Sequence, residues 1–390
     1  MHTLKPGTAF GKLVFHYENR LSEARKAHAA GRRVVGRIGH TVPAELIVAA
    51  GCTPVLIAAD LERATPVADI YVDPELPPET RTLFEAGVAG DFEFLDYLIL
   101  SRPYDKLYYF LKEIYRLGRA PKMPPFMIFD LMQSQREAVR AYNWGRLQAL
   151  VERLGRLASA PLEADAIRFA INLSNRARAM QRQVADLRQN GRISGVDAMQ
   201  ALGAGYFMHP AEYAETLGAY IADVKASSAR RPSGPRILLA TAEPLQQLML
   251  HQTLEADGAT VVAEDDNWGA RAPGEDISDE SDPLVAIFDK YWRDVPTSGV
   301  YPQAAREHWL LEQAARAEVD VVVFYVPPSD RLMGWDIPRL TETMRQKGKP
   351  VLTLFHDAMT EKGRNNIRQE LAALASSLSQ NTPSTQEARR

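Results

Sequence analysis

Residues 34–58 read VVGRIGHTVPAELIVAAGCTPVLIA, and this stretch decides the fold class. Its apolar run at 34–38 predicts a buried strand, 44–50 predicts a helix ended by Gly51, and 54–58 predicts a second strand. Further along we expect a helix at 80–89, a strand at 97–100, a helix at 105–117 and a strand at 126–129. Strands that alternate with helices of about ten residues predict βαβ units and a mostly parallel sheet.

A second series of strands and helices follows a linker at 226–235, which is rich in Ser, Arg, Pro and Gly. In this series we expect strands at 236–240, 260–263, 319–326 and 350–355, and helices at 245–256, 304–317, 338–347 and 365–378. The middle of the chain carries no strand pattern. Helices are expected there at 136–157, 163–189, 195–202 and 210–225, separated by Gly191 and by the Met-His-Pro turn at 208–210.

The predicted fold class is therefore α/β, with two Rossmann- or flavodoxin-like parallel-sheet domains joined by a helical segment. The expected boundaries are 1–132 for the first α/β domain, 133–229 for the helical segment and 230–378 for the second α/β domain, with a disordered polar tail at 379–390. In open parallel sheets ligands bind at the carboxyl ends of the strands, so we expect a cleft between the two domains.

The composition excludes several classes of protein. A formal charge of −3 gives no basic face for nucleic acid, and no apolar run approaches the roughly 18 residues of a membrane-spanning helix. Residues 1–12 lack the apolar region of a secretory signal. The single cysteine, Cys52, excludes an intramolecular disulfide and fits a reducing compartment, so we expect a cytoplasmic protein. No phosphate-binding loop and no G-x-S-x-G motif is present.

Several short fragments, in their order and spacing, resemble those of one enzyme family. The fragments are T-V-P-A-E-L-I at 41–47 with A-A-G at 49–51, Arg81 with Gly87, F-L-D at 94–96 leading to Asp105, R-I-L-L at 236–239, Gly258 to Arg271, D-P-L at 282–284, Asp320 to Asp330, and Arg368. Together they resemble the 2-hydroxyacyl-CoA dehydratase and benzoyl-CoA reductase family, in its D-component-like, non-activator subunits. The likeness runs over most of the chain.

This resemblance implies acyl-CoA or aryl-CoA chemistry with [4Fe–4S] clusters, two related subunits and an ATP-dependent activator. Such clusters are held by three or four thiolates, and this chain has one. At the positions where the family typically carries cysteine, the sequence has Pro77, Tyr104, Asn267 and Ser329. Cys52 lies elsewhere, beside the second strand, where we expect a small buried side chain.

The resemblance also implies which residues face the cleft. The catalytic candidates are His40, Asp105 and Asp330, and the substrate-binding candidates are Thr41, Tyr104, Asn267, Trp268, Arg271 and Ser329. Each has an ordinary structural alternative. A histidine at a strand end bonds a backbone carbonyl, an aspartate at a strand-to-helix turn caps the helix, and loop aromatics pack. No spacing typical of a metal site is present, and we assign no metal ligand.

We therefore expect a cluster-free partner subunit of an acyl-CoA-processing complex, with any [4Fe–4S] cluster in a paralogous subunit. Two alternatives remain open: a non-redox binding or scaffold protein on the same fold, and a cluster-independent enzyme that uses His40 with Asp105 or Asp330. We expect no cofactor held by this chain, no nucleic acid and no membrane among its partners.

Overall fold

Two four-stranded sheets, both entirely parallel, form the framework of this computed structural model. The structure describes residues 7–228, 234–241, 248–266, 274–280, 282–293, 303–330 and 333–380. The first sheet contains β1 (Val34–Ile38), β2 (Thr53–Leu56), β3 (Tyr97–Ser101) and β4 (Phe126–Phe129). The second contains β5 (Arg236–Ala240), β6 (Thr260–Asp265), β7 (Val321–Tyr325) and β8 (Val351–Leu354). The expected α/β class with two parallel sheets is confirmed.

The two sheets share one topology. Their strand orders are β2-β1-β3-β4 and β6-β5-β7-β8, so in each the chain first moves one way from the central strand and then the other way. Every residue of the central strands β1 and β3 is buried, whereas the edge strands β2 and β4 are partly exposed. Fully buried β-branched and leucine-rich strands are typical of a parallel sheet covered on both faces.

Contacts between Cα atoms divide the chain into two units, each holding one sheet. Unit 1 comprises Met1–Val184, Gln200–Ser228 and Arg271–Arg306, and unit 2 comprises Ala185–Met199, Ala229–Ala270 and Glu307–Arg390. Neither unit is continuous in sequence, so the expected helical segment is shared between them, mostly within unit 1. Residues 271–306, expected within the second domain, belong to unit 1, where Ile287 and Trp292 are buried in its core.

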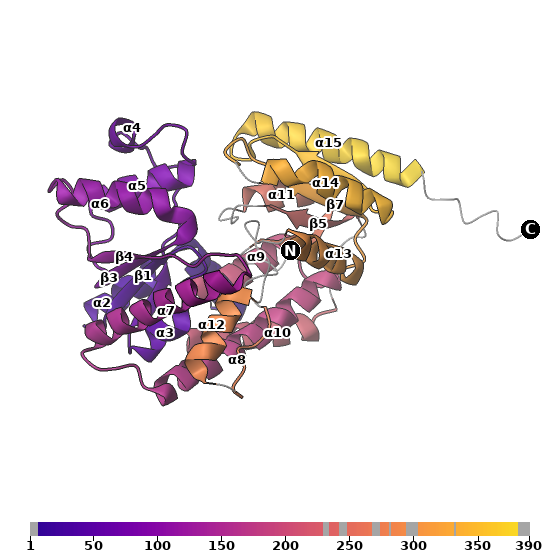
Figure 1. Ribbon diagram of the computed structural model, residues 1–390. Helices are drawn as coiled ribbons and strands as arrows, with labels where there is room; N and C mark the ends of the chain where they lie inside the picture. Colours follow the sequence, from indigo (N-terminus) through magenta and orange to yellow (C-terminus); the bar gives the residue numbers. More distant parts are fainter. Residues whose placement is uncertain are drawn as a thin grey trace, which may run out of the picture. The chain divides into compact units, whose positions relative to one another are not determined.

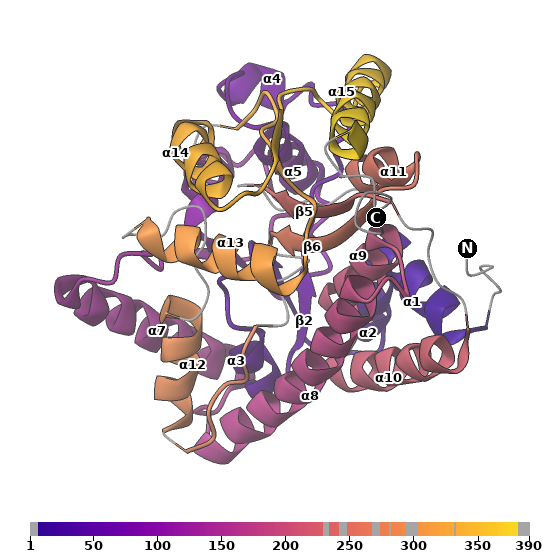
Figure 2. The same cartoon turned by 90° about the vertical axis from the view of Figure 1, so that its right-hand side faces the viewer.

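In unit 1, helices cover both faces of the sheet. These helices are α1 (Ala9–Glu18), α2 (Ser22–Ala29), α3 (Ala44–Ala49), α4 (Ala68–Tyr71), α5 (Pro78–Ala89), α6 (Asp105–Arg116), α7 (Glu137–Ala158), α8 (Ala164–Gln189, ending in unit 2), α10 (Pro210–Ala226) and α12 (Pro283–Arg293). Figure 1 shows α5 and α6 above the strands and α3 and α7 below them. The core under α3 and α7 also takes in α8 and α12. In Figure 2, α10 lies beside α8 and α1, and the Phe10 and Tyr220 rings stack 4.8 Å apart.

Unit 2 repeats this arrangement with α11 (Met249–Glu255), α13 (Ala304–Arg316), α14 (Met333–Gln346) and α15 (Glu361–Gln380). The α11 and α15 helices pack on one face of the sheet, and α13 and α14 pack on the other. Two short 3-10 helices, Arg102–Tyr104 and Ala204–Tyr206, and α9 (Gly195–Gly203) complete the description. No helix among the described residues is long and apolar enough to cross a membrane.

Most expected elements are found within a few residues of their predicted bounds, and the differences have local causes. The helix expected from Pro338 begins at Met333, because Asp330 Oδ1 accepts from the amides of Met333 (2.8 Å) and Gly334 (3.2 Å) and starts the helix earlier. The sequence analysis did not anticipate α1, α2, α4 or α12. The α2 helix buries only Ala24 and Ala27, so its apolar pattern is too sparse to recognise. Residues 381–390, within the expected tail, lie outside the described residues.

Candidate functional site

The candidate site of unit 1 lies at the carboxyl edge of its sheet, between β1 and β3. The chain leaves β1 toward β2 and leaves β3 toward β4, and in such sheets ligands bind outside the point where the direction reverses. His40 and Thr41 directly follow β1, and Ser101 and Tyr104 stand at the end of β3. We call these four residues, with Glu79 described below, the carboxyl-edge site.

Gly39 brings the two strand ends together. Its φ angle is +90°, a left-handed conformation that favours glycine. A Cβ atom at this position would lie 1.9 Å from Ser101 Oγ and 3.0 Å from Tyr104 Cε2. Only a residue without a side chain therefore allows the β1 loop to touch Ser101 and Tyr104.

Two buried hydroxyl groups mark this edge. Ser101 is fully buried, and Thr41 Oγ1 is also shielded from solvent. Within the described part of the chain, neither hydroxyl oxygen has a hydrogen-bond partner. Most buried polar groups are paired, so two such hydroxyls at one strand edge call for an explanation. Both can donate a hydrogen bond to an oxygen of a bound molecule.

His40 is half-buried and meets an aromatic residue from a distant part of the chain. The edge of its ring contacts Tyr206, with 5.0 Å between ring centroids. Tyr206 also lies under the guanidinium of Arg37, 5.6 Å from Cζ to the ring centroid. Arg37 lies in β1, is only 7% exposed and donates from Nη1 to the Val42 carbonyl at 3.3 Å. A fixed positive charge thus stands close to the His40 loop.

Tyr104 forms a hydrogen bond with a carboxylate of α5. Its hydroxyl donates to Glu79 Oε1 at 2.6 Å. Glu79 lies in the first turn of α5, where a carboxylate is favoured by the helix dipole. The sequence analysis did not select Glu79, and the only local signal is the Pro-Pro-Glu start of a helix.

The candidate aspartates act at helix starts. Asp105 is exposed, and its Oδ1 accepts from the Lys106 amide at 2.6 Å. Asp330 starts α14 in the same way, as described above, and Ser329 beside it is half-buried. Asp330 thus has the helix-capping contacts of the ordinary structural alternative, whereas Asp105 lies inside α6, whose N-cap is Tyr104, and accepts from the adjacent amide.

The predicted site residues fall into three groups. His40, Thr41, Tyr104 and Asp105 belong to unit 1, and Ser329 and Asp330 belong to unit 2, so each group is described within its own unit. Asn267, Trp268 and Arg271 lie outside the described residues. The cleft shared by the two sheets stays a prediction.

A buried polar clamp supports the loop that carries His40 and Thr41. Glu45, in the first turn of α3, is 1% exposed; it pairs with Arg178 of α8 and accepts from the Tyr291 hydroxyl of α12 at 2.8 Å. Burial alone would raise the pKa of Glu45, but Arg178 and these hydrogen bonds hold that pKa below its ordinary value. Burial and the neighbouring Glu45 carboxylate raise the pKa of Tyr291.

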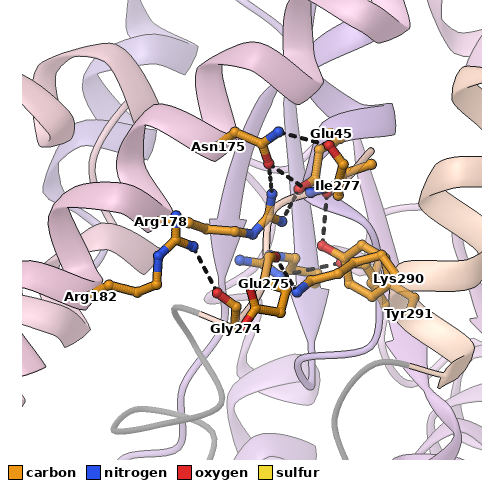
Figure 3. A network of polar contacts seen from close by, with 11 residues as sticks. Glu45, Asn175, Arg178, Arg182, Gly274, Glu275, Ile277, Lys290 and Tyr291 are labelled. Atoms are coloured by element: carbon orange, nitrogen blue, oxygen red, sulfur yellow. Dashed lines mark hydrogen bonds and ion pairs between the residues drawn. The ribbon is translucent and has the colours of Figure 1, made fainter. Parts of the chain in front are cut away.

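The same clamp extends to the segment before α12, as Figure 3 shows. Asn175 and Ile277 form a reciprocal pair of hydrogen bonds, each of 2.9 Å, and Arg178 Nη1 donates to Asn175 Oδ1 at 2.9 Å. Arg182 bonds the Gly274 carbonyl at 2.8 Å and Asp276 at 2.9 Å. The α3, α8 and α12 helices are therefore tied together directly behind the carboxyl-edge site.

Unit 2 contains its own buried ionic cluster, which the sequence analysis did not identify. Glu264 Oε1 accepts from His251 Nε2 at 2.5 Å and lies 2.8 Å from Arg188 Nη1, and all three side chains are at most 2% exposed. Burial opposes ionisation of Glu264, but Arg188 and His251 lower its pKa to about 2. Burial likewise disfavours the charged form of His251, but Glu264 more than offsets this and raises the pKa of His251.

The donor atoms of this chain do not fit an iron–sulfur cluster. Cys52 is the one cysteine of the sequence, and it lies just before β2, at the amino end of the strands. It is 6% exposed, its thiol contacts the Ala50 carbonyl at 3.6 Å, and burial raises its pKa. Tyr104, at a position where the resemblance implies a cysteine, donates its hydroxyl proton to Glu79. Among the described residues no group of three or more His, Cys, Asp or Glu side chains is arranged for a metal.

Comparison with known proteins agrees with this architecture. A family model described as 2-hydroxyglutaryl-CoA dehydratase, D-component, matches residues 40–378. The match begins at His40, after the end of β1, and includes β2, β3 and β4 of the first sheet and the whole second sheet. No curated protein matches the chain.

Proposed function

Because this chain belongs to the 2-hydroxyglutaryl-CoA dehydratase D-component family, we propose that it serves as the cluster-free partner subunit in a 2-hydroxyacyl-CoA dehydratase-like system. In this proposal a paralogous, cysteine-bearing subunit holds any [4Fe–4S] cluster, and an ATP-dependent activator supplies electrons. Our chain contributes the carboxyl-edge site, which binds the acyl part of a coenzyme A thioester. A reducing, cytoplasmic location fits its single cysteine.

The pair of buried hydroxyls, Thr41 and Ser101, is the observation that carries this proposal. A thioester carbonyl or a 2-hydroxyl oxygen accepts hydrogen bonds, and donors held in a water-poor site favour charge on such an oxygen. His40 stands beside Thr41, and its ring nitrogens can donate or accept a hydrogen bond. The buried charge of Arg37 favours an oxygen that carries negative charge.

The cluster-free role rests on the thiol count and on Tyr104. Iron–sulfur clusters require three or four thiolates, and the one thiol here is buried away from the carboxyl edge. At a position where the resemblance implies a cysteine, Tyr104 packs against Gly39 and bonds Glu79.

The capping contacts of Asp330 favour a binding role over acid–base chemistry by this carboxylate. A non-redox binding protein on the same fold is therefore our second candidate.

Calorimetric titration of the anaerobically purified chain with 2-hydroxyglutaryl-CoA tests the proposed site, with free coenzyme A as the matched ligand control. We expect the thioester to bind more tightly than coenzyme A, and Thr41→Val and Ser101→Ala to remove most of that difference. Ser22→Ala is the matched protein control, since Ser22 Oγ is also buried without a partner among the described residues but lies in α2. Equal binding of the two ligands would contradict acyl recognition.

The partner role needs a separate measurement. Copurification with a cysteine-bearing paralogue, followed by iron analysis of the complex and of this chain alone, should place the iron in the partner. A chain that binds the thioester but never copurifies with such a subunit would favour the second candidate.

A further inference from the structure

A cavity of unit 1 lies at the opposite end of the strands from His40. Its volume is about 380 Å³, within the range of roughly 300–1,000 Å³ typical of small-molecule sites. Thr53, the first residue of β2, and Arg32, just before β1, place it at the amino ends of these strands. We call it the amino-edge cavity. It is separate from the carboxyl-edge site and independent of the proposed function.

One part of the cavity wall is apolar. Phe207 and Met208 precede α10, and Pro54 and Ala24 line the cavity with them. Phe207 and Met208 are each 3% exposed, so both are held firmly in the fold. They present only the edges of their side chains, and the half-buried Pro54 presents more, so the wall can contact a small apolar ligand group.

The charged groups of the cavity are of two kinds. Glu212 is paired with Lys12 at 2.6 Å, and Glu23 is paired with Lys26 at 2.7 Å. Arg32 and Glu215, in contrast, form no ion pair with each other or with any other described residue, although both line this cavity. An ion pair would require their charged atoms to lie within 4.0 Å. Both side chains are exposed, so the rim of the cavity carries one positive and one negative group that are not paired with each other.

His209 adds a directed hydrogen-bond donor beside Arg32. Its Nδ1 accepts from the Ala211 amide at 3.3 Å, which leaves the proton of the neutral ring on Nε2. Burial, with a smaller contribution from Arg32, lowers the pKa of His209, so the ring is neutral at pH 7. Its Nε2–H has no partner among the described residues and can donate to an anion alongside the guanidinium.

We propose that the amino-edge cavity binds an α-amino acid with an apolar side chain. The carboxylate of this ligand meets Arg32 and His209, its ammonium group meets Glu215, and its side chain packs on Phe207 and Met208. A phosphate or other polyanion is disfavoured, because Glu23, Glu212 and Glu215 line the same cavity.

Matched ligands separate the two charged contacts. We would titrate the full chain calorimetrically with L-leucine, L-methionine and L-phenylalanine. Two leucine analogues each lack one charge: 4-methylpentanoate has no amine, and 3-methylbutylamine has no carboxylate. We expect at least one amino acid to bind, and each leucine analogue to bind about tenfold more weakly than leucine. Inorganic phosphate should give no saturable binding.

Matched variants identify the groups responsible. Arg32→Gln and Glu215→Gln should each weaken amino-acid binding about tenfold, with unchanged circular dichroism and thermal unfolding. Arg345→Gln and Glu18→Gln are the controls, since both residues are exposed and have no side-chain contact among the described residues. Binding should be unaffected by Thr41→Val and Ser101→Ala. The proposal is overturned if none of the three amino acids binds, if both leucine analogues bind as well as leucine, or if Arg32→Gln and Glu215→Gln bind like wild type.

Discussion

Gly39 shows how one residue determines the geometry of the carboxyl-edge site. Its left-handed backbone and its contact with Ser101 and Tyr104 are two separate demands, and Gly51 satisfies only the first. Gly51, with a φ angle of +70°, has open space where a Cβ atom would stand.

Replacing these glycines separates backbone strain from steric overlap. Gly51→Ala should cost about 1–2 kcal/mol of unfolding free energy, from backbone strain alone. Gly39→Ala should cost about 1–3 kcal/mol more, because the new methyl group overlaps Ser101 Oγ. Urea unfolding of both variants measures the difference. Equal losses would mean that the β1 loop does not touch β3 as described.

His251 links the stability of unit 2 to pH. The pKa of His251 is raised in the folded protein because its partner Glu264 stays ionised beside Arg188. A raised pKa means that the folded state binds the proton more tightly than the unfolded state. The stabilisation is therefore fully present below the unfolded pKa of about 6.5 and is lost as pH rises through the folded pKa.

We expect the unfolding free energy of wild type to fall as pH rises above about 6.5. The variant His251→Gln should lack this decrease of unfolding free energy with pH. Urea titrations at a series of pH values measure it. His308→Gln is the control, because His308 is 76% exposed and faces a similarly exposed Glu312. If His251→Gln and His308→Gln changed the slope equally, the buried pair would have no special role.

At the scale of elements, the clamp around Glu45 joins three helices that are far apart in sequence. It holds the first turn of α3 against α8 and α12, immediately after the loop that carries His40 and Thr41. Glu45 and Arg178 are buried away from water, so the charge of each is stabilised by its partner. Arg182 and Asp276 at the margin of the clamp are 35% and 49% exposed and depend on each other far less.

Arg178→Met should therefore cost about 3–5 kcal/mol, because it leaves the Glu45 carboxylate buried without its counter-charge. Arg182→Gln should cost at most about 1 kcal/mol, as expected for an exposed ion pair. The double variant Glu45→Gln/Arg178→Met should be more stable than Arg178→Met alone, since no charge is left buried. Denaturant unfolding of the three variants decides this, and a similar loss for Arg178→Met and Arg182→Gln would contradict the clamp.

At the scale of the whole molecule, one sheet topology is used twice within a single chain. In each sheet the chain adds its second strand on one side of the first strand and its third strand on the other side. Ligands bind at the carboxyl ends of the strands where the order reverses in this way, so each sheet presents such an edge. The chain belongs to a family of dehydratase subunits, yet its thiol content differs from what an iron–sulfur protein needs.

The isolated chain should take up no iron–sulfur cluster. After anaerobic incubation with iron and sulfide, followed by desalting, we expect no visible cluster absorbance and no stoichiometric iron. Cys52→Ala should give the same spectrum as wild type, because the buried thiol plays no part. Stable binding of about four irons per chain, as a cubane cluster needs, would disprove the expectation.

The sequence alone determined the α/β class, the two parallel sheets and the family, because strand and helix periodicity and short motifs are local properties. It also located His40, Thr41 and Tyr104 at strand ends. Only the tertiary structure decided that Ser101 is a buried hydroxyl beside Gly39 and that Glu79 binds Tyr104. These contacts join β1, β3 and α5, and no local pattern records a contact between distant segments.

The same reason explains why residues 271–306 belong to unit 1 although they follow strands of unit 2 in sequence. A linker at 226–235 indicates a boundary, but the packing of Trp292 and the pairing of Tyr291 with Glu45 arise only when the chain folds back. Likewise, Glu264, His251 and Arg188 appear in sequence as three unrelated polar residues. Burial makes them one ionic cluster, because only removal from water couples their charges strongly.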